Sequence, residues 1–177
     1  MRRSFSGTTV GMPKSIQSLD EIGSRVEGGF VRIIHSVRIE RPVDAVWAIV
    51  ADPETHTRWR PTLKEFRQVS DGPLAVGSKI REVLEWRGRT IEIDDVVTGF
   101  EPPYRFAVHG AWKAAEFDLE LLLLPLGDDA TEVTFDWPLR PKSLPMKIAA
   151  PFLRRTMERG TAEEAECLRR LAENDAL

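Results

Sequence analysis

The sequence predicts an α+β domain in which a curved, seven-stranded antiparallel sheet wraps around one long C-terminal helix. Between residues 63 and 137, six segments with apolar and polar side chains in alternation follow one another across short turns. Consecutive strands with links this short form an antiparallel meander. From Leu144 to about Asn174 the apolar spacing changes to that of a helix with one buried face.

Residues 30–40 predict the first strand, because apolar and polar side chains alternate along them. Pro42 then begins a short amphipathic helix, at a position where the missing proline N–H costs nothing. Asp52 precedes Pro53 and predicts the cap of a second short helix that runs toward Trp59. Two short helices are therefore expected after the first strand.

Turn residues separate the six later strands, with clusters at 71–73, 87–88, 102–103 and 127–129. The strands are expected at 63–69, 78–86, 89–100, 105–110, 115–124 and 131–137. Pro151 and Gly160 lie within the long helix, and a kink or a short break is expected near either one.

Length and composition indicate one globular domain, since the chain has 177 residues of which 42% are hydrophobic and 30% charged. Residues 1–29 are rich in Ser, Gly and Thr and predict a flexible N-terminal arm, with at most a short docking helix at 15–26. The domain itself is expected to span residues 30–177.

Charge and cysteine content narrow the classes of function. The net charge of −3 and the lack of a basic patch argue against nucleic-acid binding, which depends on Lys and Arg contacts to phosphate. Cys167 is the single cysteine and cannot form an internal disulfide, so a reducing, cytoplasmic location is expected. The leucine run at 121–124 is far shorter than the ~20 residues of a membrane span, and no other apolar run approaches that length.

Four sequence phrases occur in a fixed order with fitting gaps: IERPVDAVW at 39–47, WRP at 59–61, DGPLAVG at 71–77 and VTGFEPP at 97–103. In these phrases the chain resembles the START-like (SRPBCC) superfamily, in particular its polyketide cyclase/dehydrase and lipid-transport branch. The resemblance covers residue 31 to the C-terminus. It implies a helix-grip fold with a cavity for an apolar or amphipathic ligand, and it implies no metal or nucleotide cofactor.

The turn at 87–88 determines which side chains of the neighbouring strands face inward. A loop of two or four residues places Glu82 opposite Ile93 and Ile80 opposite Asp95. A three-residue loop with a bulge at Gly88 would instead set two glutamates against each other. The first register is favoured because it pairs apolar residues on one face and opposite charges on the other. Glu82 and Asp95 then point toward the interior.

The same alternation, continued along the later strands and the long helix, predicts a mostly apolar lining for a small-molecule site. Trp59 is included because it could form the rim of the cavity, although packing of the short helix against the sheet is the favoured role. The predicted ligand-binding residues are Trp59, Ile80, Leu84, Trp86, Ile93, Val97, Phe106, Val108, Phe117, Leu119, Phe135, Trp137, Leu153 and Met157.

Three polar residues are candidates for catalysis: Glu82, Asp95 and His35. A carboxyl group in an apolar cavity has a raised pKa and can serve as general acid or base, with His35 orienting or sharing the proton. The favoured alternative is that His35 is a core histidine, while the carboxylates lie in water at strand ends or pair with Arg89. His56 is expected to be exposed. The three histidines of the chain lack metal-ligand spacing, so no metal site is expected.

Three functions remain open from the sequence. The first is a carrier that binds a small hydrophobic or amphipathic molecule, such as a lipid or a polyketide-like compound. The second is a cyclase, aromatase or dehydratase that acts on a polyketide-like substrate by acid–base chemistry. The third is a protein-interaction module like the co-chaperone branch of the superfamily, and it ranks last because that branch has a Trp-Trp phrase where this chain has WRP.

Overall fold

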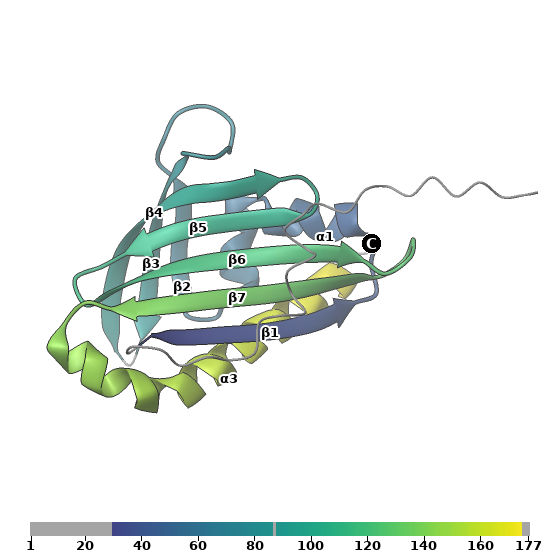
Figure 1. Cartoon of the computed structure of the whole chain (residues 1–177). Helices are drawn as coiled ribbons and strands as arrows, with labels where there is room; N and C mark the ends of the chain where they lie inside the picture. The colour runs from purple at the N-terminus through teal and green to yellow at the C-terminus, as the bar shows by residue number, and fades with distance from the viewer. Residues whose placement is uncertain (1–29, 87, 175–177) are drawn as a thin grey trace, which may run out of the picture.

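One continuous antiparallel sheet forms the body of the protein, with strands in the order β1-β7-β6-β5-β4-β3-β2 (Figure 1). The computed structural model describes residues 30–86 and 88–174, without the side chains of residues 150, 151 and 153, so the expected N-terminal arm lies outside the described residues. The strands are β1 (Val31–Ile39), β2 (Leu63–Gln68), β3 (Lys79–Trp86), β4 (Arg89–Glu101), β5 (Arg105–Ala111), β6 (Ala115–Pro125) and β7 (Thr131–Pro141).

The helices confirm the predicted order. α1 (Val43–Val50) is followed by a 3-10 turn, η2 (Pro53–Thr55), and by α2 (His56–Trp59). Asp52 caps η2, because its carboxylate accepts a hydrogen bond from the backbone N–H of Glu54 at 3.0 Å. The long helix α3 (Leu144–Asn174) runs along one face of the sheet (Figure 1).

Of the two alternatives expected for the long helix, a kink or a short break, the break does not occur, since α3 is continuous from end to end. Its axis changes direction along its course instead (Figure 1). A proline removes one backbone hydrogen bond and a glycine costs only about 1 kcal/mol relative to alanine. Burial of the C-terminal half of the helix, where Ala165 and Leu168 are fully covered, outweighs such local costs.

The C-terminal half of α3 covers a part of the core that is fully buried. Ile39, Val46, Val50, Trp59 and Leu168 are each at most 1% exposed there. At the other end of the sheet, where β7 leads into α3, apolar residues such as Trp137 and Met146 are only partly buried. No described side chain of α3 between residues 144 and 160 is buried, whereas Thr161, Ala165, Leu168 and Ala172 are, so the first half of the helix covers the sheet less completely than the second half.

Gly110 shows how closely side chains approach the inner surface of the sheet. A Cβ added at this position would lie 2.2 Å from Oδ1 of Asp95 and 2.4 Å from Cζ of Phe117. Real Cβ atoms do not tolerate such distances, so glycine is required here by the two side chains that lie across it.

The substitution Gly110→Ala is expected to lower the free energy of unfolding by about 1–3 kcal/mol, because the new methyl group must displace two buried side chains. Gly160→Ala is the control. Nothing lies within 4 Å of that added Cβ, and alanine should stabilise the helix by about 0.5–1 kcal/mol. Urea denaturation of both variants measures the difference, and a harmless Gly110→Ala would contradict the packing described.

Candidate ligand-binding site

Four charged side chains from four different elements meet inside the protein and form what we call the interior ionic cluster: Arg60, Glu82, Asp95 and Glu164. Arg60 follows the last turn of α2, and its Nη2 donates to Oε1 of Glu82 on β3 at 2.6 Å. Its Nε lies 3.7 Å from Oε2 of Glu164 on α3. The arginine thus connects the short helix, the sheet and the long helix.

The two strand carboxylates reach the interior because of the hairpin register. Glu82 lies opposite Ile93 and Asp95 opposite Ile80, which confirms the favoured register and excludes the slipped one. Both carboxylates are 1% exposed. The expectation that they lie in water or pair with Arg89 was therefore wrong, since the alternation of buried and exposed positions along β3 and β4 carries them inward.

The charge on Arg60 is stabilised by the carboxylates that it contacts. Burial opposes the charge on Arg60, but the carboxylates of Glu82 and Glu164 outweigh it and raise the pKa of the guanidinium. Burial also raises the pKa of Glu164, against the opposing effect of Arg60. A buried ion pair of this kind is stable only where good hydrogen-bond geometry and further polar partners offset the hydration free energy that both groups lose.

Asp95 differs from its neighbours because no described residue donates a hydrogen bond to either of its carboxyl oxygens. Burial, then the charge of Glu82 and a hydrogen bond with it, raise the pKa of Asp95 to about 9, and Arg60 only partly offsets this. At neutral pH the group is therefore a neutral carboxylic acid that can donate its proton to Glu82 or to another acceptor.

His56 is 2% exposed, so the expectation of an exposed histidine was wrong. Its Nε2–H donates to the backbone carbonyl of Val50 at 2.9 Å, and its ring stacks on Phe66 at 4.1 Å between centroids. Burial and the charge of Arg60 lower the pKa of His56 to about 3. The ring is therefore neutral, and its Nδ1 is a buried acceptor without a partner.

The predicted apolar lining residues occupy the same inner face as the carboxylates, or the helices packed on it. Nine of them are buried: Trp59, Ile80, Ile93, Val97, Phe106, Val108, Phe117, Leu119 and Phe135. Four are half-buried: Leu84, Trp86, Trp137 and Met157. The side chain of Leu153 lies outside the described part of the chain.

Three aromatic rings form a row near the start of α3, and the middle ring lies beside Asp95. The ring centroids of Trp112 and Phe117 are 6.0 Å apart, and those of Phe117 and Trp137 are 5.6 Å apart. Phe117 and Asp95 both lie across Gly110. The indole Nε1 of Trp137 is buried and has no hydrogen-bond partner. The row therefore offers apolar surface and leads to two unpartnered polar groups.

His35 is not brought to the interior ionic cluster. It lies on β1 opposite Phe135, and three strands separate β1 from β4 in the sheet. The side chain is half-buried, and among the described residues it has no hydrogen bond or ion pair. Its distance from Asp95 along the sheet follows from topology, because the first strand joins the edge formed by β7.

Sequence reasoning did not identify Arg60 and Glu164. The one available signal for Arg60 was its place between Trp59 and Pro61, where a short helix ends against the sheet. Glu164 falls among several charged residues of α3, and its spacing does not distinguish it from exposed ones. Within the described residues, no group of three or more His, Cys, Asp or Glu side chains is placed to hold a metal ion.

Comparison with known families agrees with this architecture. The model of the family described as polyketide cyclase / dehydrase and lipid transport matches residues 31–173. The chain belongs to this family, which confirms the resemblance to the START-like superfamily. No curated protein matches the sequence. In the described part of the chain, no helix is both long and apolar enough to span a membrane.

Solved structures of low sequence identity share the fold. The Zhui aromatase/cyclase from Streptomyces sp. R1128 is 15% identical, with a TM-score of 0.72 over 84% of this chain and 96% of that chain. A START superfamily protein from Mycobacterium smegmatis is 16% identical, with a TM-score of 0.70 over 82% and 99%. Norcoclaurine synthase from Thalictrum flavum, in complex with dopamine and hydroxybenzaldehyde, is 14% identical, with a TM-score of 0.61 over 84% and 89%.

Two ion pairs of equal length allow the effect of burial to be measured. Arg60 contacts the buried Glu82 at 2.6 Å, and Arg38 contacts the exposed Glu40 at 2.6 Å. Arg60→Met is expected to lower the free energy of unfolding by about 3–5 kcal/mol, because Glu82 is left charged and buried. Arg38→Met should cost less than about 1 kcal/mol. Equal costs in denaturant titrations would contradict the structural role of the buried pair.

Asp95 should make stability depend on pH. Its folded-state pKa of about 9 lies above the ordinary value of 3.8, so between these limits the folded protein holds a proton that the unfolded chain has released. Stability contributed by the protonated form is therefore lost as pH rises, by about 1.4 kcal/mol per pH unit for one proton.

Asp95→Asn removes this proton, and its free energy of unfolding should decline less steeply with pH than that of the unsubstituted protein. Denaturant titrations between about pH 5 and 8 measure the two slopes. Asp94→Asn changes an exposed side chain on the outer face of the same strand and is the matched control. Identical slopes for Asp95→Asn and the unsubstituted chain would rule out a protonated Asp95.

Proposed function

We propose that this protein binds a small hydrophobic or amphipathic molecule, lipid or polyketide-like, between the inner face of the sheet and α3. The observation that carries the proposal is the Asp95 carboxyl group, which is buried on an apolar face with no donor for either oxygen. Buried polar groups nearly always have hydrogen-bond partners, and exceptions need an explanation. A hydroxyl group of a bound molecule would donate the missing hydrogen bond, and a carbonyl group would accept one from the protonated carboxyl.

The surroundings of Asp95 support a ligand with one polar end. The aromatic row of Trp112, Phe117 and Trp137 offers contact for an apolar body, and Trp137 Nε1 offers a second donor. Binding sites for small molecules generally combine a mostly apolar lining with a few fixed polar groups. The ligand would therefore lie along this row with its polar end at Asp95 and Glu82.

Acid–base catalysis is the second candidate, and the unequal environments of two carboxyls favour it. Arg60 donates a hydrogen bond to Glu82, whereas Asp95 is protonated, and two carboxyls in such unlike environments can provide a base and an acid in one site. Asp95 would donate its proton to a carbonyl oxygen of a polyketone-like ligand and recover one from it later. His35 would contact only a ligand that extends toward β1.

The cellular setting is part of the proposal. A single cysteine, which cannot form an internal disulfide, is compatible with a cytoplasmic location. The net charge of −3 argues against nucleic acid as a general partner.

Native mass spectrometry of the full chain purified from its own host tests ligand binding. One bound molecule is expected, and it should be lost after extraction with organic solvent. Asp95→Asn should weaken its retention by about fivefold to tenfold, the value of one hydrogen bond, while Asp94→Asn should retain it like the unsubstituted protein. Protein that carries no ligand and binds none of the host's extracted lipids or polyketides would overturn the proposal.

The same variants separate the two candidates once a ligand is identified. A carrier returns the molecule unchanged, and Asp95→Asn affects only its affinity. An enzyme converts the molecule, and Asp95→Asn then lowers kcat by about 10²-fold or more, the usual contribution of a general acid.

A further inference from the structure

The first two turns of α3 carry a row of exposed apolar side chains, here called the α3 apolar stripe: Leu144, Ile148 and Phe152. They are 71%, 64% and 83% exposed. Their spacing of four residues places them on one face of the helix. Single exposed apolar residues are ordinary, but an aligned set of large ones marks an interaction surface.

The α3 apolar stripe is distinct from the face of the helix that packs against the core. Met146 and Met157 belong to a different face of the same helix, and both pack against the core cluster. The helix therefore already buries one apolar face against the protein. The stripe is a second apolar face, and it points away from the first.

Basic residues surround the stripe. Between Arg140 and Arg159 the sequence has six basic residues and one acidic residue, in a chain whose net charge is −3. Lys147, Arg155 and Arg159 are exposed and make no ion pair with any described residue. Arg140, Lys142 and Arg154 are paired with acidic residues, so the net positive charge beside the stripe comes from the other three.

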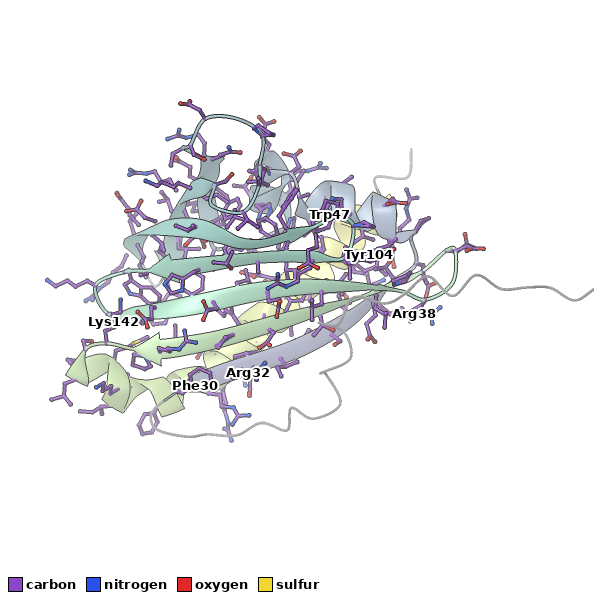
Figure 2. All side chains as sticks on the ribbon, turned by 45° about the horizontal axis from the view of Figure 1, so that its top comes forward. Phe30, Arg32, Arg38, Trp47, Tyr104 and Lys142 are labelled. Atoms are coloured by element: carbon purple, nitrogen blue, oxygen red, sulfur yellow. The ribbon has the colours of Figure 1, made fainter. Side chains whose placement is uncertain are left out.

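The neighbouring turn between β5 and β6 adds to this charge. It touches the start of α3, because the backbone N–H of Lys142 donates to the carbonyl of Ala114 at 2.8 Å. Lys113 precedes Ala114 and is exposed. Figure 2 shows Lys142 and Phe30 at this end, and Trp47 and Arg38 at the other end of the sheet.

We propose that the α3 apolar stripe docks on an anionic lipid surface. A helix with exposed Leu, Ile and Phe beside Lys and Arg lies in the interface of a bilayer, with its apolar side chains among the acyl chains and its cations at anionic headgroups. A second copy of this chain fits less well, since a two-fold contact would bring the same cations face to face.

The docking surface goes beyond the proposed ligand site and adjoins its less covered end. Trp112 and Trp137 lie next to the junction of β7 and α3 and are half-buried. Docking would bring this end of the interior close to lipid, where an apolar ligand could enter or leave without crossing water.

Co-sedimentation of the full chain with vesicles tests the proposal. Binding is expected to vesicles of phosphatidylcholine mixed with phosphatidylglycerol, to be weaker with phosphatidylcholine alone, and to fall with added salt. Ile148→Gln combined with Phe152→Gln should lower the partition coefficient about tenfold or more, because both side chains leave the interface. Lys147→Gln with Arg155→Gln should weaken binding to the anionic vesicles only.

Val76→Gln is the matched control, because Val76 is an apolar residue that is 63% exposed in the loop between β2 and β3. This variant should bind vesicles like the unsubstituted chain, and Phe152→Gln alone serves if the double variant does not fold. The proposal is overturned if the unsubstituted chain does not bind anionic vesicles, or if the stripe variants bind them as strongly as the unsubstituted chain does. It is also overturned if the variants instead abolish a dimer seen by sedimentation equilibrium. Ligand retention in solution should be unchanged in these variants, so the two proposals fail independently.

Discussion

The contact between Arg60 and Glu82 is the constraint on which the interior depends. Two charges 2.6 Å apart are taken almost completely out of water, and each would be strongly destabilising without the other. Because Arg60 ends α2, Glu82 belongs to β3 and Glu164 belongs to α3, the pair fixes a short helix, the sheet and the long helix relative to one another. The interior ionic cluster therefore also holds these three elements together.

The protonation state of Asp95 follows from this arrangement of charged groups. Arg60 already pairs with Glu82 and Glu164. An ionised Asp95 would therefore be repelled by Glu82, and Arg60 would offset this repulsion only in part. The group responds by keeping its proton, as buried acids do. The interior therefore presents a neutral acid beside a carboxyl group that is paired with arginine, and these two groups support both proposals for the site, the binding of a polar ligand end and the transfer of a proton.

The helix α3 divides the molecule into two unlike ends. Its C-terminal half closes the core with small and branched side chains, among them Ala165, Leu168 and Ala172. Its first turns expose large apolar side chains and cations beside the row of aromatic rings. Burial of the core is thus concentrated in one half of this helix, and exposed apolar and basic side chains are concentrated in the other half.

The sequence by itself determined the order of elements, the hairpin register and the inward direction of Glu82 and Asp95, because strand alternation, turn residues and helical spacing are local properties. Only the tertiary structure decided that Arg60 and Glu164 join these carboxylates, that His56 is buried and that His35 lies apart. Those outcomes depend on which elements pack together across long stretches of chain. The pairing and desolvation of a charged side chain are set by such neighbours and not by its own sequence context.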